Sequence, residues 1–281
     1  MRFFDPRLTP ARADLAAKKL EGKVAAARYV EGHSFEVIEP QAPLRGEPAS
    51  DAPLATEALK GERVTIYDSN AEGWAWGQLA ADGYVGWLPA NALAPAGAEP
   101  THKVAALRTF AFPGPSIKLP PVEALPLGAR LAIAHFDDRM AVTQSGSYVP
   151  VPHLAPVESY EPDFIAVAER FLGVPYLWGG KTALGLDCSG LVQVALTACG
   201  TSCPRDSDVQ EEALGTAADV SDVRRGDLIF WKGHVAIARD RSSLLHANAF
   251  HMAVAIEPIG DAIARIRSAG FEVTCVRRQV P

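Results

Sequence analysis

Proline is distributed unevenly along the chain, and this constrains the fold more than any other feature of the sequence. Seventeen of the 22 prolines precede residue 161, and only five follow it. Because proline is excluded from helix interiors and central strands, the first part of the chain is expected to form small β modules joined by turns. Beyond Pro156 the apolar residues recur at helical spacing, which indicates a domain of a different kind.

The spacing divides the chain into four segments. Residues 1–22 are predicted to contain a short helix over residues 8–20, closed by Gly22, because apolar side chains there share one helical face. Residues 23–95 and 96–157 each contain short alternating stretches between turn residues, as in small barrels. The strands expected in these two segments cover residues 24–30, 62–68, 73–80 and 84–89, then 103–110, 129–136, 140–144 and 147–151.

Residues 158–281 are predicted to form an α+β domain. Helices are expected over residues 163–173, from Cys188 to Gly200, and over 207–214, where Asp206 is the expected N-cap and Gly215 the stop. The strands expected after them cover residues 227–231, 234–239, 243–248, 252–257 and 272–277. Helices followed by antiparallel strands are typical of the α+β class.

Composition excludes several classes of protein. The 281 residues are 48% hydrophobic and 21% charged, with a net charge of −6, so no nucleic-acid partner and no anionic membrane partner is expected. Four cysteines are too few for a disulfide scaffold and favour free thiols in a reducing compartment. No apolar run is long enough to span a membrane, and Asp5, Pro6 and Arg7 interrupt any apolar signal segment. We therefore expect a cytoplasmic protein.

The strongest chemical signal is a cysteine at the predicted start of a helix. Tyr-Leu-Trp-Gly-Gly at 176–180 leads to Asp187-Cys188-Ser189-Gly190. Unpaired N–H groups and the positive end of the helix dipole are expected to favour the Cys188 thiolate, to lower its pKa and to receive an oxyanion. Taken alone, Cys188 is better interpreted as an inert buried residue at a helix start, since most cysteines are inert.

Two histidines supply the rest of a nucleophilic site. His234 begins one predicted strand, and His246 lies in the next. If these strands pair, His246 can hydrogen-bond to His234 and fix its tautomer. Nucleophile, base and orienting residue together indicate acyl transfer through a thioester. A zinc site that uses Cys199 and Cys203 lacks compact ligand pairs, and Lys181 lacks a phosphate-loop frame, so neither a metal nor a cofactor is expected.

The run PYLWGG, DCSG, PRDSDVQ, GDLIFW, HVAIA and LLHAN resembles the NlpC/P60 family of papain-like cysteine peptidases over roughly residues 160–281. The resemblance implies a papain-like α+β catalytic domain in which Cys188 is the nucleophile, His234 the base and His246 the third polar residue. The family cleaves peptides of bacterial peptidoglycan, typically between γ-D-glutamate and the following diamino acid.

The first half of the chain narrows this expectation. Residues 23–95, with LATEALKGE and DGYVGWLP, resemble a bacterial SH3 domain, and residues 96–157 resemble a more divergent second copy. The combination is similar to γ-D-glutamyl-L-diamino acid endopeptidases of the dipeptidyl-peptidase type, which recycle murein peptides that have a free N-terminal L-alanine. The implied fold is two SH3-like β-barrels followed by the catalytic domain.

The resemblance also suggests residues that contact the substrate. Glu57 and Tyr84 of the first SH3-like domain would bind the substrate ammonium, with Asp187 as a further candidate, because a buried ammonium needs carboxylate and hydroxyl partners. The remaining candidates are Tyr176 for the scissile region and Ser189 and Ser207 for the D-glutamate carboxylate. Structural roles stay open: Tyr84 as a core aromatic, Glu57 as a solvated turn residue, and Asp187 or Ser207 as a helix cap.

Three functions compete at this point. The first is a monomeric cytoplasmic peptidase that acts on L-Ala-γ-D-Glu-diamino acid peptides. The second is a wall-remodelling hydrolase, amidase or acyltransferase with the same chemistry but another substrate, such as polymeric peptidoglycan. The third is a non-catalytic peptide-binding protein of SH3 type, which the complete set of Cys188, His234 and His246 disfavours.

Overall fold

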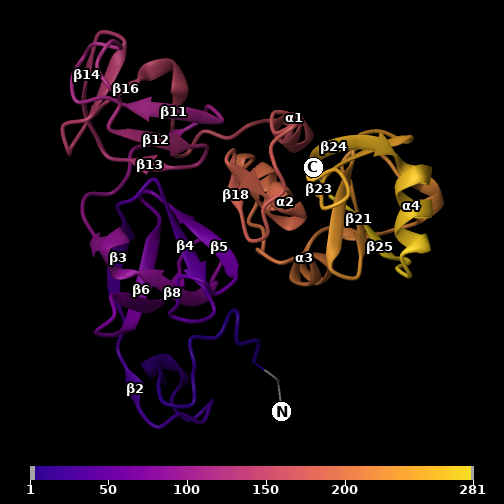
Figure 1. Cartoon of the computed structure of the whole chain (residues 1–281), viewed down its shortest axis with the longest axis horizontal. Coiled ribbons are helices and arrows are strands. Elements are labelled where there is room, and N and C mark those ends of the chain that lie inside the picture. The colour runs from indigo at the N-terminus through magenta and orange to yellow at the C-terminus, as the bar shows by residue number, and fades with distance from the viewer. Residues whose placement is uncertain (1–3, 280–281) are drawn as a thin grey trace. The chain divides into compact units, whose positions relative to one another are not determined.

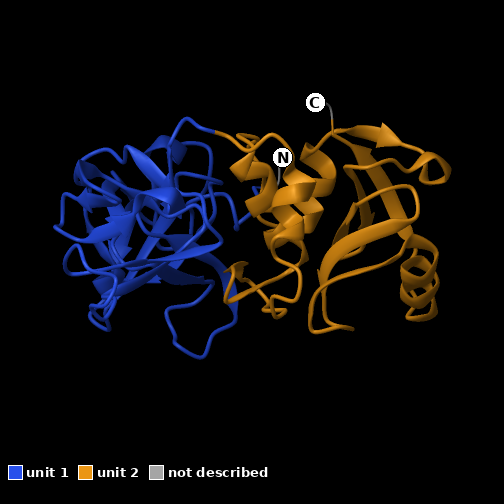
Figure 2. Ribbon diagram, turned by 90° about the horizontal axis from the view of Figure 1, so that it is seen from above, with its two compact units in different colours: residues 1–159 blue, residues 160–281 orange. Residues whose placement is uncertain are grey.

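A computed structural model describes residues 4–279 of the chain, which divide into two compact units at residues 159 and 160 (Figures 1 and 2). The ends of the first and last predicted segments, 1–3 and 280–281, lie outside the described residues. Within the described residues, no helix combines the length and apolar character needed to cross a membrane.

The N-terminal residues of the first unit do not form the predicted helix. Residues 16 and 17 form strand β1 (Ala16–Ala17), parallel to β2 (Tyr29–Val30), and a short 3-10 helix, η1, covers Lys18–Leu20. Leu15 packs on Trp76 and Trp87 instead of on neighbours along a helix. Tertiary packing and the missing N–H of Pro10 thus override the helical spacing, and the predicted helix is wrong.

The first strand set is a seven-stranded antiparallel sheet in the order β5-β4-β8-β7-β6-β3-β9. The strands are β3 (His33–Val37), β4 (Gln41–Arg45), β5 (Leu54–Leu59), β6 (Arg63–Ser69), β7 (Trp74–Leu79), β8 (Val85–Pro89) and β9 (Leu93–Pro95), with 3-10 helix η2 (Ala90–Ala92) before the last. The sequence predicted β6, β7 and β8 but missed the others. Of the strand expected over residues 24–30, only β2 is present.

The second strand set repeats this order of pairing. Its strands are β10 (His102–Val104), β11 (Arg108–Ala111), β12 (Glu123–Pro126), β13 (Arg130–Leu131), β14 (Ile133–Asp137), β15 (Met140–Thr143), β16 (Tyr148–Pro150) and β17 (Leu154–Pro156), with 3-10 helix η3 (Val151–His153) before β17. A bridge from Phe112 to Tyr148 joins β11 to β16, and β10 pairs with both β13 and β17. The sequence predicted one unbroken strand over residues 103–110, where the structure has β10 and β11. It predicted another over residues 129–136, where the structure has β13 and β14.

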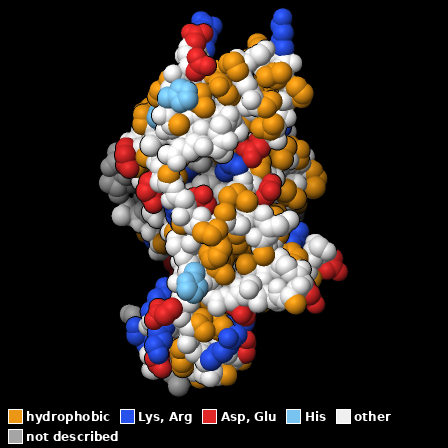
Figure 3. Space-filling model, turned by 90° about the vertical axis from the view of Figure 1, so that its left-hand side faces the viewer, with side chains coloured by type: hydrophobic (Ala, Val, Ile, Leu, Met, Phe, Trp, Pro, Cys, Tyr) orange, Lys and Arg blue, Asp and Glu red, His pale blue; other side chains and the backbone are white. Residues whose placement is uncertain are grey.

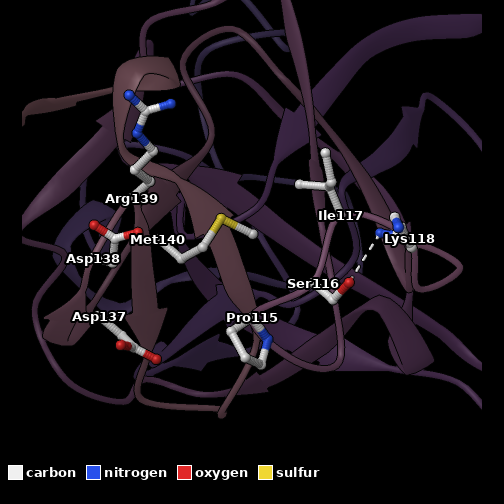
Figure 4. A pocket seen from close by; sticks show the side chains of 8 residues that line it. All are labelled: Pro115, Ser116, Ile117, Lys118, Asp137, Asp138, Arg139 and Met140. Carbon is white, nitrogen blue, oxygen red and sulfur yellow. Dashed lines mark hydrogen bonds between the residues drawn. The ribbon is translucent and has the colours of Figure 1, made fainter.

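The two strand sets have separate hydrophobic cores. Val37, Leu44 and Leu88 belong to the first core, while Val104, Leu125 and Val149 belong to the second. A cavity of about 430 Å³ lies in the second set between residues 115–118 and the turn at 137–140 (Figure 4). The described residues that line it include neither cysteine nor histidine, so it offers no thiol–imidazole pair. On the face drawn in Figure 3, acidic and basic side chains are interspersed.

The second unit contains a six-stranded antiparallel sheet in the order β20-β25-β21-β22-β23-β24. The strands are β20 (Thr216–Ala218), β21 (Asp227–Trp231), β22 (His234–Ala238), β23 (Ser243–Asn248), β24 (Ala253–Pro258) and β25 (Val273–Arg278), and the small hairpin β18 (Lys181–Thr182) and β19 (Gly185–Leu186) lies apart from them. The helices are α1 (Phe164–Glu169), α2 (Cys188–Ala198), α3 (Ser207–Ala213), α4 (Ile259–Ser268) and the 3-10 helix η4 (Val220–Asp222).

Helices cover both faces of this sheet (Figures 1 and 2). Helix α4 packs on one face, where Ile263 and Ala262 contact a core that includes Ile229 and Trp231. Helices α1 and α2 lie on the opposite side. The predicted α2, α3 and five main strands are present, α1 is shorter than predicted, and α4 was missed. The α+β class expected for this segment matches its helices and antiparallel sheet.

Candidate active site

The site begins at the first turn of α2, where Asp187 is the N-cap and its carboxylate accepts a hydrogen bond from Gly190 N at 2.7 Å. The two glycines of the preceding loop allow this turn to close. A Cβ on Gly190 would lie 2.4 Å from Gly180 O, and a Cβ on Gly180 would lie 2.4 Å from Gly185 O. The glycine-rich loop therefore packs backbone against backbone at the helix start.

The carboxylate of Asp187 pairs with a buried arginine that was not predicted from the sequence. Arg205 is 1% exposed and donates hydrogen bonds to both carboxylate oxygens of Asp187, to Ser189 Oγ and to Gly180 O. Asp187 also accepts a bond from Gly179 N. These contacts fit the helix-cap role left open for Asp187, with its negative charge compensated inside the unit.

Cys188 lies where α2 meets strand β22. The ladder between β22 and β23 ends at Ile237 and Leu245. Beyond the paired part of this ladder, the N–H of Val235 faces the sulfur of Cys188, as does the N–H of Ser189. This contact places the thiol beside the residue that follows His234.

The predicted lowering of the Cys188 pKa is wrong. Burial raises the pKa of the thiol to about 12, and the negative charge of Asp187 adds to the effect. The N–H groups of Val235 and Ser189 and the positive charge of Arg205 act in the opposite direction but do not outweigh burial. At neutral pH Cys188 is therefore a neutral thiol.

The hydrogen bond predicted between the two histidines is present. Nε2 of His234 and Nδ1 of His246 are 2.8 Å apart. Burial is the main reason that the pKa of each imidazole is lowered to about 3; the positive charge of Arg265 and the neighbouring histidine, His246 for His234 and His251 for His246, add to it. Both imidazoles are therefore neutral at neutral pH.

Two further residues extend this chain of contacts. Nε2 of His246 lies 2.7 Å from Glu257 Oε1 at the end of β24, and Arg265 of α4 donates to the same oxygen. Neither residue was predicted from the sequence. The alternation along β24 could have found Glu257, because it lies two residues beyond Ala255, the register partner of His246, and so shares its face.

Tyr176 interacts electrostatically with Cys188, and Ser207 lies on the neighbouring helix α3. Burial raises the pKa of the Tyr176 hydroxyl, and its electrostatic interactions with Cys188 and Asp187 raise it further. Ser207 is the first residue of α3, which Gln210 connects to the start of α2 by a bond to Ser189 O at 2.9 Å. The hydroxyl of Ser189 is already bonded to Asp187 and Arg205.

Glu57 and Tyr84 belong to the first unit. Glu57 lies on β5 with its neighbour in the ladder at Pro43, and it is 4% exposed, so the alternative of a solvated turn residue is wrong. Tyr84 precedes β8 and is part of the core of the first strand set, in agreement with its alternative as a core aromatic. Substrate contacts for both residues remain proposals.

One group among the described residues has the geometry of metal ligands. A ligand atom from each of His246, His251 and Glu257 lies within 4.8 Å of the other two. However, Glu257 already forms an ion pair with Arg265. The four cysteines are free thiols.

Two segments of the chain match known protein families. Residues 44–93 match the bacterial dipeptidyl-peptidase SH3 domain, and residues 173–270 match the NlpC/P60 family. A γ-D-glutamyl-L-lysine dipeptidyl-peptidase of Bacillus cereus is 29% identical over 238 residues, which cover 73% of this chain and 71% of that protein. A protein of the same name from Bacillus subtilis is 39% identical over 93 residues, 30% of this chain and 31% of that protein.

A peptidoglycan endopeptidase of Mycobacterium tuberculosis, RipB, is 30% identical over 139 residues, which cover 43% of this chain and 56% of that protein. The crystal structure of an NlpC/P60 family protein from Bacillus cereus shares the fold, with a TM-score of 0.75 and 23% identity over 88% of this chain and all of that chain. The second unit thus contains an NlpC/P60 domain, and the first unit contains a bacterial dipeptidyl-peptidase SH3 domain.

Proposed function

We propose that this protein is a cysteine peptidase that hydrolyses the γ-D-glutamyl–diamino acid bond of murein peptides with a free N-terminal L-alanine, releasing L-Ala-D-Glu. The observation that carries the proposal is the hydrogen-bonded pair His234–His246, together with the N–H of Val235, the residue after His234, which faces the thiol of Cys188 at the start of α2. The similarity to γ-D-glutamyl-L-lysine dipeptidyl-peptidases supports the bond and the substrate class.

In the proposed reaction, His234 takes the thiol proton as the sulfur of Cys188 attacks the γ-carbonyl carbon of D-glutamate. N–H groups at the start of α2 and the hydroxyl of Tyr176 stabilise the oxyanion. The imidazolium of His234 then protonates the leaving amine of the diamino acid, and a thioester remains on Cys188. A water molecule deprotonated by His234 hydrolyses the thioester, which releases the dipeptide and restores the thiol.

The SH3 match supports the requirement for a free amino end. Residues 44–93, which match the dipeptidyl-peptidase SH3 domain, include Glu57 and Tyr84. We propose that these two side chains bind the ammonium of the substrate L-alanine, together with Asp187, and that Ser189 and Ser207 bind the D-glutamate carboxylate. A small free peptide of this kind is a product of wall turnover, so the proposed role is murein-peptide recycling by a monomer.

A direct test is digestion of L-Ala-γ-D-Glu-meso-diaminopimelate, free and N-acetylated, followed by mass spectrometry. We expect the native protein and a Cys199→Ala control, altered at the other end of α2, to cut only the free peptide. Cys188→Ala should fold normally and cut neither. Turnover by Cys188→Ala would refute the mechanism, and failure of the native protein to cut either peptide would refute the substrate.

The second candidate is hydrolysis of polymeric peptidoglycan, which the similarity to RipB favours. Peptide stems in the polymer are linked through their amino end, so this activity does not need a free L-alanine. Rapid cleavage of the N-acetylated peptide, together with release of fragments from intact murein, would favour this function over the first.

A further inference from the structure

The carboxylate of Glu257 lies at the buried end of the histidine pair. Oε1 of Glu257 is 2.7 Å from Nε2 of His246, and Nδ1 of His246 is 2.8 Å from Nε2 of His234. The side chain of His246 is fully buried and that of Glu257 is 11% exposed. Arg265 donates a charge-assisted hydrogen bond to the same oxygen of Glu257.

The donor and acceptor capacity of each group determines where the protons lie. A carboxylate only accepts hydrogen bonds, so Nε2 of His246 must carry a proton. A neutral imidazole has one N–H, so Nδ1 of His246 is an acceptor and Nε2 of His234 must donate to it. Nδ1 of His234 is then left with a lone pair.

We propose that Glu257 is a positioning residue which, through His246, fixes the tautomer of His234 so that Nδ1 of His234 is the atom that takes the proton of Cys188. The inference rests on the proposed role of Cys188 as nucleophile. Glu257 itself does not touch the sulfur. When His234 accepts the proton, the negative charge of Glu257 stabilises the positive charge that develops on the histidine pair.

Arg265 works against Glu257 in this arrangement. It shares Oε1 of Glu257, and its positive charge lowers the pKa of both histidines. A further titratable group, His251 of the turn between β23 and β24, also lowers the pKa of His246. Cys188 of α2 faces the N–H of Val235, the residue after His234. The carboxylate therefore sets the tautomers, while burial, with a smaller contribution from the guanidinium, keeps the imidazoles neutral.

A metal ion held by Glu257, His246 and His251 is the competing interpretation of the same residues. It would require a lone pair on the ligand atom of His246 that now faces Glu257, and it would place a cation beside Arg265. Both requirements conflict with the contacts described, because Glu257 is already paired with the positively charged Arg265. The test below therefore includes a chelator.

The first measurement is the rate at which iodoacetamide alkylates Cys188 in the full-length protein as a function of pH, followed by peptide mass spectrometry. At neutral pH we expect Glu257→Gln to slow alkylation by about tenfold to a hundredfold, since an amide carries no charge and donates as well as accepts hydrogen bonds. The matched control is Glu272→Gln, which removes the same charge from the exposed pair of Glu272 with Arg267 and should leave the rate unchanged.

The second measurement is the imidazole ¹⁵N spectrum of Cys188→Ala, with and without Glu257→Gln and in the presence of EDTA. We expect Nε2–H tautomers for His234 and His246, unchanged by EDTA, and a mixture of tautomers after Glu257→Gln. Unchanged tautomers and alkylation in Glu257→Gln would overturn the inference. A change caused by EDTA alone would also overturn it, in favour of a metal.

Arg265→Gln provides an independent test should Glu257→Gln fail to fold. It should raise the pH at which the alkylation rate falls on the acid side, because a charge that lowers the histidine pKa values is lost. A fall at the same pH as in the native protein would contradict the arrangement. None of these measurements uses a peptide substrate. A protein with the expected tautomers and alkylation that cleaves no murein peptide would refute the proposed function and leave the role of Glu257 intact.

Discussion

The guanidinium of Arg205 meets both carboxylate oxygens of Asp187, with nitrogen–oxygen distances of 2.9 and 2.8 Å. Both side chains are buried, and Asp187 directly precedes the proposed nucleophile. The start of α2 is thus supported by a paired charge, and not by apolar packing alone. Removal of either partner would leave a buried charge without compensation.

Substitution of this arginine should therefore destabilise the second unit strongly. We expect Arg205→Met to cost about 3–5 kcal/mol, the usual range when one partner of a buried pair is lost. Arg239→Met, which breaks the more exposed pair of Arg239 with Glu169, is the control and should have little effect. Hydrogen exchange of α2 peptides, measured by mass spectrometry, would report the loss; equal protection in both variants would contradict this account.

The closeness of backbone to backbone at Gly190 gives a second prediction. Gly190→Ala should destabilise the fold by about 1–3 kcal/mol, because its Cβ would overlap the carbonyl of Gly180. Gly260→Ala, in α4, should instead stabilise the helix by about 0.5–1 kcal/mol, since nothing lies within 4 Å of its Cβ. The two melting temperatures should move in opposite directions, and a shared direction would speak against the packing argument.

The site should also make stability depend on pH. Since the folded pKa of His234 and His246 is lowered from 6.5 to about 3, the unfolded chain binds more protons than the folded chain between these values. Stability is therefore highest above pH 6.5 and is lost as the pH falls toward 3. Thermal melts across this range should show the loss, and replacement of both histidines by Gln should reduce it.

The raised pKa of Cys188 predicts that stability is also lost at alkaline pH. Between about pH 9 and 12 the folded protein keeps a proton that the unfolded chain releases, so stability should fall as the pH rises through this window. Cys188→Ala should remove this component, whereas Cys199→Ala should retain it. An alkaline limb that is identical in the native protein and Cys188→Ala would contradict the buried neutral thiol.

The proposed contacts of the first strand set predict a change in specificity. Tyr84→Phe and Glu57→Gln should each raise KM for the free peptide by about tenfold, because a buried ammonium would lose a hydrogen-bond or charge partner. Glu99→Gln, at a side chain that is 88% exposed, is the matched control. If both variants keep the KM of the native protein, Glu57 and Tyr84 do not bind the substrate.

Local patterns in the sequence predicted much of the second unit and of the site. The N-cap Asp187 and the apolar run after it mark the start of α2, and alternation marks the strands that carry His234 and His246. Helix α4 had a comparable signal, with Pro258 at its start and Ile259, Ala262, Ile263 and Ile266 at helical spacing, but it lies between strands and was missed.

Properties that depend on tertiary surroundings were not predictable in this way. The predicted helix over residues 8–20 gave way to the packing of Leu15 on the tryptophans of the first strand set. The pKa of Cys188 follows burial, which no local pattern reports, and it outweighs the helix start. Arg205 and Glu257 act through partners that are 18 and 11 residues away in the chain.

Strand β25 has a consequence for the order of events during synthesis. In each strand set of the first unit, the last strand pairs with an early strand of the same set: β9 pairs with β3, and β17 pairs with β10. All strands of both sets are therefore available before the second unit emerges from the ribosome. In the second unit, β25 lies between β20 and β21, although Cys188 is translated long before it. The nascent chain therefore cannot assemble the complete sheet beside the thiol of Cys188 until residues 273–278 have been made.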